Sequence, residues 1–234
     1  MRAQCALAGW GTVKQYIRAL SPRFEFGIVI LCAFGLFIAG SILEAFDASA
    51  RTPISNEDLQ SIVVYELVVA VLLLTFLRIR QWTLQSFGVA PSPRETLVGV
   101  GLAIVVYLAY VVVFLISAEL SPYVAQAAAN QTFVAPGLSM ALVLAVSIIN
   151  PVFEELFVCG YVVTALRERR GFWTAVNVSI AIRLLYHLYQ GPIGVLNIIP
   201  VGFIFAYWYG RTARLWPLIV AHAIFDLLGL SAGG

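Results

Sequence analysis

The chain has few charged residues for its length. Of its 234 residues, 11% are Asp, Glu, Lys or Arg and 61% are apolar, whereas about a quarter of a soluble domain is charged. One globular core of this size cannot hide so much apolar surface, which excludes an ordinary soluble fold. Lipid is the expected surrounding, and a helix that spans it needs about 20 mostly apolar residues.

Other features are scarce as well. The net charge is only +2 and no stretch has dense basic residues, so the sequence predicts no nucleic-acid partner. The three cysteines, Cys5, Cys32 and Cys159, are odd in number and far apart, which excludes a disulfide framework or a zinc knuckle. We find no internal repeat, no low-complexity segment and no soluble domain.

Long apolar segments dominate what remains. Each must be helical, because lipid satisfies no backbone hydrogen bonds. The sequence therefore predicts an all-α, polytopic transmembrane helix bundle with about seven spans. The predicted spans cover residues 26–43, 61–77, 96–117, 138–166, 172–188, 193–209 and 215–230.

The loops predict an orientation. Twelve of the fourteen basic residues fall before the first span or after the second, fourth and sixth, and the alternate loops hold five acidic residues against Arg51 alone. The positive-inside rule places the N-terminus in the cytoplasm and the C-terminus outside. Residues 120–137 contain Pro122 and Pro136, so we expect a loop there rather than an eighth span.

The N-terminal segment differs from the rest. Residues 1–20 are interrupted by two glycines and a lysine before any apolar core forms, which does not match a cleavable signal peptide. We expect a short amphipathic helix in the interface, with Trp10 and Tyr16 at the headgroups. Residues 1–23 would then be a cytoplasmic or interfacial segment, and residues 24–234 a single transmembrane domain.

Several polar side chains fall inside the predicted spans. Each costs at least a few kcal/mol near the bilayer centre unless it is paired or hydrated. For Glu66 alone, we expect no more than pairing with a neighbouring helix. The full set is Glu66, Glu154, Glu155, Arg183, His187, His222 and Asp226.

The spacing of these residues indicates a site. Residues four apart share one face of a helix, and at about 1.5 Å per residue the three helices concerned present their polar pairs at overlapping depths. Pro151 removes a backbone hydrogen bond and should kink the fourth span, opening a wet pocket around Glu154. The pairs are Glu155 with Cys159, Arg183 with His187, and His222 with Asp226.

Three segments resemble a known family. Residues 150–160 contain Glu154-Glu155, residues 183–187 end in His187, and residues 222–226 read His-Ala-Ile-Phe-Asp. In order and spacing they are similar to the EExxxR, FxxxH and HxxxN/D signatures of the CPBP (Abi) family of CAAX prenyl proteases and bacteriocin-processing or immunity proteins. The resemblance covers about residues 138–230, and it implies a peptidase-like core there in a multi-pass protein of a prokaryotic cell (inner) membrane.

The resemblance also implies roles for the site residues. Glu154 would be the general base that activates water, with help from His187. His222 and Asp226 would hold the oxyanion, and Glu155 would be a supporting carboxylate. An aspartate donates a hydrogen bond only when it is protonated, so the role of Asp226 depends on its protonation.

A metal-dependent alternative uses some of the same residues. Glu154, His187 and His222 form a competent zinc set with an open position. No HExxH-like spacing brings a base and ligands together on one helix, so we favour the metal-free account and assign no cofactor.

Two positions depart from the family signatures. Cys159 stands where the resemblance implies arginine, and Arg183 stands where it implies phenylalanine. Either activity has been lost, or the guanidinium has moved from one helix to the next. The second interpretation predicts that Arg183 supports the site by pairing with Glu155 or Glu154.

The leading hypothesis is an intramembrane endopeptidase that acts on membrane-anchored or lipidated peptide or protein substrates in the bilayer. One alternative is a degenerate relative that serves as a binding or immunity protein. A second is a proton-coupled transporter that uses Glu66, Glu154 and the histidines. A cysteine peptidase using Cys159 and His187 is disfavoured, because so apolar a setting keeps the thiol protonated. The residues predict no oligomeric state.

Overall fold

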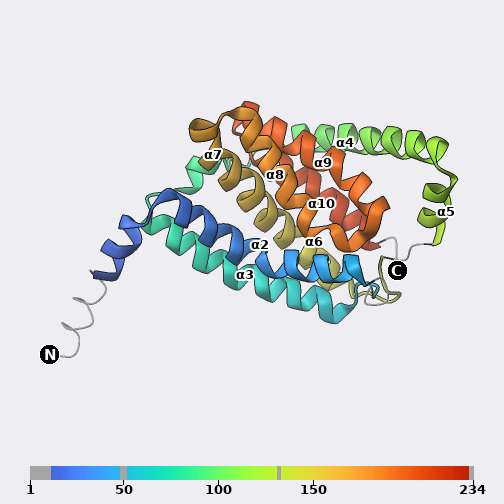
Figure 1. Cartoon of the computed structure of the whole chain (residues 1–234), viewed down its shortest axis with the longest axis horizontal. Helices are drawn as coiled ribbons and strands as arrows, with labels where there is room; N and C mark the ends of the chain where they lie inside the picture. The colour runs from blue at the N-terminus through green and yellow to red at the C-terminus, as the bar shows by residue number, and fades with distance from the viewer. Residues whose placement is uncertain (1–11, 48–51, 131–132, 232–234) are drawn as a thin grey trace.

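The computed structural model describes residues 12–47, 52–130 and 133–231. Its regular structure is helical apart from one isolated bridge between Ile54 and Val134. The helices form one bundle (Figure 1). Residues 12–19 are helical and Tyr16 is exposed, as expected for the N-terminal segment, whereas Trp10 lies outside the described residues.

All seven predicted spans are helical. In the described part of the chain, five helical runs are long and apolar enough to cross a membrane. The two shorter apolar helices, α8 and α10, have 15 and 16 residues, or roughly 22–24 Å at 1.5 Å per residue, against about 30 Å for a bilayer core. The seven are α2 (Pro22–Phe46), α3 (Asn56–Ile79), α4 (Pro93–Leu120), the run α6 (Met140–Glu154), η3 (Glu155–Tyr161) and α7 (Val162–Arg170), then α8 (Phe172–Tyr186), α9 (Gly191–Thr212) and α10 (Trp216–Ser231).

Serine caps begin the first three long helices. Ser21, Ser55 and Ser92 each accept a hydrogen bond from a backbone N–H of the first turn. These caps satisfy amide donors that have no partner inside the helix. Proline follows at the first position of α2 and α4, where its missing N–H costs nothing.

The predicted loop at residues 120–137 is wrong in part. A nine-residue helix, α5 (Pro122–Asn130), occupies its first half. Pro122 stands at the first helical position, where its fixed φ favours a helix rather than ending one. A second short helix outside the predicted spans is the 3-10 turn η2 (Leu84–Phe87).

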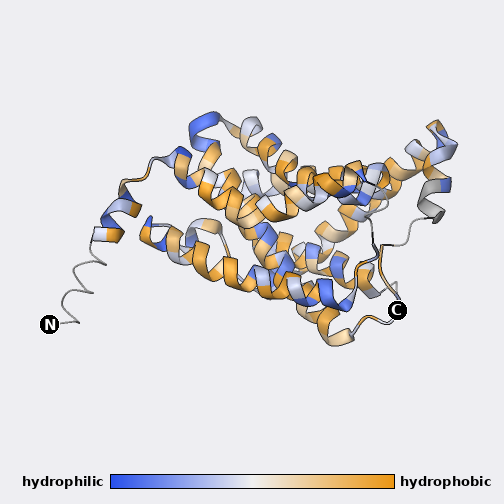
Figure 2. Ribbon diagram, turned by 60° about the horizontal axis from the view of Figure 1, so that its bottom comes forward, coloured by the Kyte–Doolittle hydropathy of each residue, from blue (hydrophilic) through white to orange (hydrophobic). Residues whose placement is uncertain are grey.

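The run from α6 to α7 lies at the centre of the bundle. About 61% of its apolar window is buried, against 17–22% for α2, α3 and α4, whose outer faces expose large apolar side chains. In Figure 2, apolar residues extend along the helices, and hydrophilic residues gather at helix ends and inside the bundle. Outer helices with exposed apolar faces thus pack around a buried central run.

The central run changes its winding next to Pro151. The proline lies inside α6, and the seven following residues of η3 form a π-helix, all of them buried. The helix therefore does change after Pro151, in the form of a wider turn that begins at Glu155, and the kink with a wet pocket around Glu154 stays a prediction. Such π-helical segments occur often at functional sites.

A second irregularity separates α8 from α9. The chain leaves the helix at His187, forms the 3-10 turn η4 (Leu188–Gln190) and re-enters at Gly191, whose φ of +70° favours glycine. The Tyr189 N–H donates to Ser41 Oγ of α2 at 2.8 Å. This bond matters because a broken helix in an apolar bundle must find other partners for its backbone.

Candidate active site

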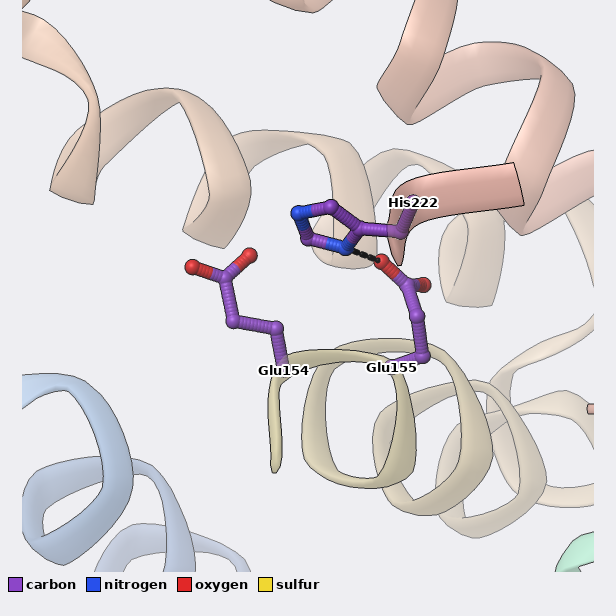
Figure 3. A group of neighbouring side chains, drawn as sticks. All are labelled: Glu154, Glu155 and His222. Atoms are coloured by element: carbon purple, nitrogen blue, oxygen red, sulfur yellow. Dashed lines mark hydrogen bonds and ion pairs between the residues drawn. The ribbon is translucent and has the colours of Figure 1, made fainter. Parts of the chain in front are cut away.

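Glu154 and Glu155 lie where α6 passes into the π-helix. Figure 3 shows both side chains projecting from this central run toward His222 of α10. Glu155 is fully buried, while the Glu154 side chain keeps about 12% of its surface exposed. The two adjacent carboxylates therefore differ in access: one is closed in by protein and the other remains reachable.

Arg183 of α8 holds both carboxylates. Its Nη2 lies 2.7 and 2.8 Å from the two carboxylate oxygens of Glu155, and its Nη1 lies 3.3 Å from Glu154 Oε2. The guanidinium of Arg183 thus lies within the distance of about 4 Å that defines a salt bridge to both glutamates. The geometry differs from a fork of two parallel bonds, because one nitrogen serves both oxygens of Glu155.

His222 links Glu155 to Asp226. Its Nδ1 lies 2.7 Å from Glu155 Oε1, and its Nε2 lies 3.4 Å from Asp226 Oδ1. Because Glu155 accepts, Nδ1 carries the proton of the shorter contact. The other oxygen of Asp226 accepts a hydrogen bond from Asn150 Nδ2 at 2.9 Å. A chain of polar contacts thus runs from Glu155 of η3 through His222 and Asp226 of α10 to Asn150 of α6.

His187 sits at the end of α8 and reaches the glutamates indirectly. Its Nδ1 lies 2.9 Å from the Arg183 carbonyl oxygen, an acceptor, so Nδ1 carries a hydrogen and Nε2 has a free lone pair. Its ring centroid is 4.5 Å from that of Tyr186. The Tyr186 hydroxyl in turn donates to Glu154 Oε2 at 2.6 Å.

Tyr186 and Asn150 are two site residues to which the sequence analysis gave no role. Tyr186 lies three residues after Arg183, and Asn150 lies four residues before Glu154. Both spacings place a polar group on the same helix face as a predicted site residue. That signal was present in the sequence, but neither residue carries a charge that would require an explanation in a membrane span.

Cys159 lies next to the guanidinium of Arg183 and not next to His187. It is fully buried, and its Sγ is 3.9 Å from Ser179 Oγ and 4.0 Å from Arg183 Nη2. None of its hydrogen bonds within the described ranges involves His187. The position that the family signature gives to arginine therefore contacts an arginine supplied by the next helix.

Glu66 of α3 does not make the interhelical pair that the sequence suggested. It is 1% exposed, and its Oε2 has no hydrogen-bond partner in the part of the chain that the structure describes. It is therefore a further buried carboxyl group, on a helix that packs against α6.

Three residues have the spacing of a metal site. One ligand atom each from Glu154, Glu155 and His222 lie within 4.8 Å of one another, and His187, the expected ligand, is not in this group. However, Glu155 already binds Arg183 and His222, and the Arg183 guanidinium lies against both carboxylates. A divalent ion there would face a permanent buried cation, so these residues do not fit a metal.

Comparisons with known proteins address the C-terminal half. Residues 136–228 match the family model "Type II CAAX prenyl endopeptidase Rce1-like". An 85-residue region is 31% identical to the Bacillus subtilis (strain 168) protein named "Putative membrane peptidase YdiL", and it covers 36% of this chain and 34% of that protein. The chain thus spans about a third of the length of this relative. No solved structure gives a significant match.

The matched region holds the whole site except Glu66. The π-helical turn with its two glutamates, the arginine and histidine of α8, and the α10 histidine and aspartate all lie within residues 136–228. The resemblance inferred from the sequence is confirmed for this part of the chain: the residues of the site lie in the region that is similar to the Rce1-like type II CAAX prenyl endopeptidases.

Proposed function

We propose that the chain is an intramembrane endopeptidase that hydrolyses a peptide bond with water activated by Glu154. The observation that carries the proposal is the asymmetry of the Glu154 carboxylate. Its hydrogen bonds from Tyr186 and Arg183 both fall on Oε2, and the side chain is partly exposed. Oε1 is then the oxygen that can accept a proton from water, in a position fixed by the bonds on Oε2.

The proposed reaction begins at this oxygen. Water donates a proton to Glu154, and the water oxygen attacks the carbonyl carbon of the peptide bond. The carbonyl oxygen then becomes the oxyanion. With His222 protonated at both nitrogens, its Nε2–H is a candidate donor to that oxyanion, because its contact to Asp226 is long, at 3.4 Å, and leaves it only weakly bound. When the C–N bond breaks, the proton held by Glu154 passes to the leaving amine. Hydrogen-bond donors that point at the developing negative charge commonly supply a large part of an enzyme's rate enhancement.

The surrounding residues would position Glu154 and His222. Glu155 fixes His222 through Nδ1, and Arg183 keeps the charge of Glu155 balanced. Asp226 accepts from Asn150, which favours a role in orienting His222 over donation to the oxyanion. His187 has Nε2 free beside Tyr186 and suits the transfer of a proton toward the amine.

We also propose the orientation and organisation inferred from the loops. Seven spans cross the membrane with the N-terminus cytoplasmic, residues 1–23 lie at or below that surface, and residues 24–234 form one domain. Contacts at one end of the bundle support this: Arg80 pairs with Glu25 at 2.5 Å, and Arg214 pairs with Glu95 at 3.3 Å. The basic ends of α3 and α9 therefore lie beside the starts of α2 and α4, as a single cytoplasmic face requires.

The proposed substrates are membrane-anchored or lipidated peptides or proteins. The catalytic groups are enclosed by helices whose outer faces are apolar, so a substrate already held in the bilayer has the shortest route to them. The matched family and the bacterial relative support a peptidase of a prokaryotic cell membrane. A degenerate binding or immunity protein is the second candidate, and the cysteine at position 159 favours it.

Comparing the membrane proteomes of cells that express the wild type or Glu154→Gln separates the two candidates. A peptidase leaves uncleaved precursors only in cells with the variant, and a binding protein leaves the two proteomes alike. Glu57→Gln, at an exposed position on α3, is the matched control and should behave as wild type. With a cleaved precursor as purified substrate, Glu154→Ala should lower the rate about 100-fold or more, the usual scale for losing a general base.

A further inference from the structure

Glu66 is a buried carboxyl group that the proposed reaction does not use. It lies on the buried stripe of α3, between Leu59 and Leu73. Its Oε2 is without a hydrogen-bond partner among the described residues. Buried polar atoms normally have partners, so this position needs an explanation.

A second buried polar atom of the same kind lies on the facing helix. Ser147 of α6 is 4% exposed, and its Oγ has no partner in the described part of the chain. Helices α3 and α6 pack together where Leu59 meets Val143 and Val146. The two buried atoms thus lie on two helices that pack against each other.

The register of the two helices places these atoms in neighbouring layers. The starts of α3 and α6 are joined, because the Ser139 N–H donates to Asn56 Oδ1 at 2.7 Å, and both helices run from this end of the bundle (Figure 1). At 1.5 Å per residue, Ser147 lies about 12 Å beyond Ser139, and Glu66 lies about 15 Å beyond Asn56. Asn150, which binds Asp226, lies about 16 Å along α6.

We propose that Glu66 and Ser147 hold water between α3 and α6, next to the Asn150–Asp226 pair, and that Glu66 is a positioning residue for the hydrolytic water. The proposal rests on the proposed function, since each peptide bond cleaved consumes one water molecule in surroundings dominated by lipid. A carboxyl and a hydroxyl group supply the two to four polar contacts that a buried water needs. The Glu66 carboxyl group and the Ser147 hydroxyl group would hold the water through hydrogen bonds alone, and neither forms or breaks a covalent bond.

Replacing Glu66 separates this role from a structural one. Glu66→Leu removes a buried polar group and should raise Tm, while kcat for a cleaved substrate falls about tenfold and KM stays within about twofold. Glu66→Gln keeps groups that bind water and should retain most of the activity. Leu73→Ile, on the same buried stripe, is the matched control and should leave kcat unchanged.

Two outcomes of this comparison overturn the proposal. If Glu66→Leu leaves kcat unchanged, the carboxyl group has no part in supplying water. If Glu66→Leu lowers Tm and Glu66→Gln is equally inactive, Glu66 has a structural partner instead.

A thiol-labelling experiment tests the water site without any cleavage assay. In full-length protein carrying Cys5→Ser and Cys32→Ser, Ser147→Cys should react with methyl methanethiosulfonate at least about ten times faster than Val143→Cys, a buried apolar position one turn away. Adding Glu66→Leu should slow the reaction at position 147. Equal, slow labelling at both positions rules out the water site. Fast labelling in a protein that cleaves nothing supports the water site and rejects the peptidase.

Discussion

One guanidinium nitrogen of Arg183 lies 2.7 and 2.8 Å from the two carboxylate oxygens of Glu155, and both side chains are fully buried. The same nitrogen is 4.0 Å from Cys159 Sγ. The family signature places an arginine four residues after the second glutamate, on the same helix. Here a guanidinium from α8 reaches that place, and a small thiol leaves room for it.

Exchange of the two positions tests whether the guanidinium has been relocated. Arg183→Phe should abolish activity, because it leaves Glu155 and Glu154 buried without their cation. Breaking a buried pair in this way typically costs about 3–5 kcal/mol of stability. Arg183→Phe combined with Cys159→Arg should restore part of the activity, measured as cleavage rate in purified protein.

Arg183→Lys is the control for this exchange. It keeps the charge but loses the planar group that contacts two carboxylates, so we expect a folded protein of intermediate activity. Thermal unfolding in detergent shows which variants are folded. Full activity of Arg183→Phe would contradict the relocation.

Tyr186→Phe should lower kcat with little change in stability. The substitution removes the 2.6 Å bond to Glu154 Oε2 and leaves the ring, which stacks on Phe34, in place. The bond fixes the position of the general base, and a misplacement of about 1 Å can cost about 100-fold in rate, so a fall in kcat of roughly 10- to 100-fold is expected. An unchanged rate would show that Arg183 alone orients Glu154.

Chelators should leave the cleavage rate unchanged. The Arg183 guanidinium already lies against both glutamates, and a divalent ion at the same place would be repelled. The measurement is the rate after dialysis against a strong chelator, followed by addition of zinc. Loss of activity with recovery on zinc addition would establish a metal mechanism.

Labelling from each side of the membrane tests the proposed topology. In protein carrying Cys5→Ser and Cys32→Ser, a thiol at Ser231 should react with an impermeant reagent from outside the cell. A thiol at Arg169 should react only after the cytoplasmic side is opened. Both positions are exposed at helix ends, so burial does not explain a negative result. Labelling of position 231 from the cytoplasmic side alone would reverse the orientation.

The helical bundle could be predicted from the sequence because the solvent leaves little choice. Seven apolar stretches in a chain with so few charges must be helical in lipid, and all seven are helices. The sequence also predicted short spans at 172–188 and 215–230, and α8 and α10 are short. The contact that meets the broken backbone after His187 could not be predicted, since Tyr189 N–H donates to Ser41 of α2, 148 residues away. The helix at Pro122 was missed because proline both ends helices and begins them.

Part of the candidate site could be proposed from the sequence, but its contacts could not. The order and spacing of Glu154, Glu155, His187, His222 and Asp226 were enough to indicate the family whose model matches residues 136–228, and polar groups in apolar spans require partners. Which partner each group takes depends on how helices rotate and pack, and local spacing does not determine that. Tertiary structure alone paired Arg183 with Glu155 and attached Tyr186 to Glu154, and it left Glu66 Oε2 without a hydrogen-bond partner in the part of the chain that the structure describes.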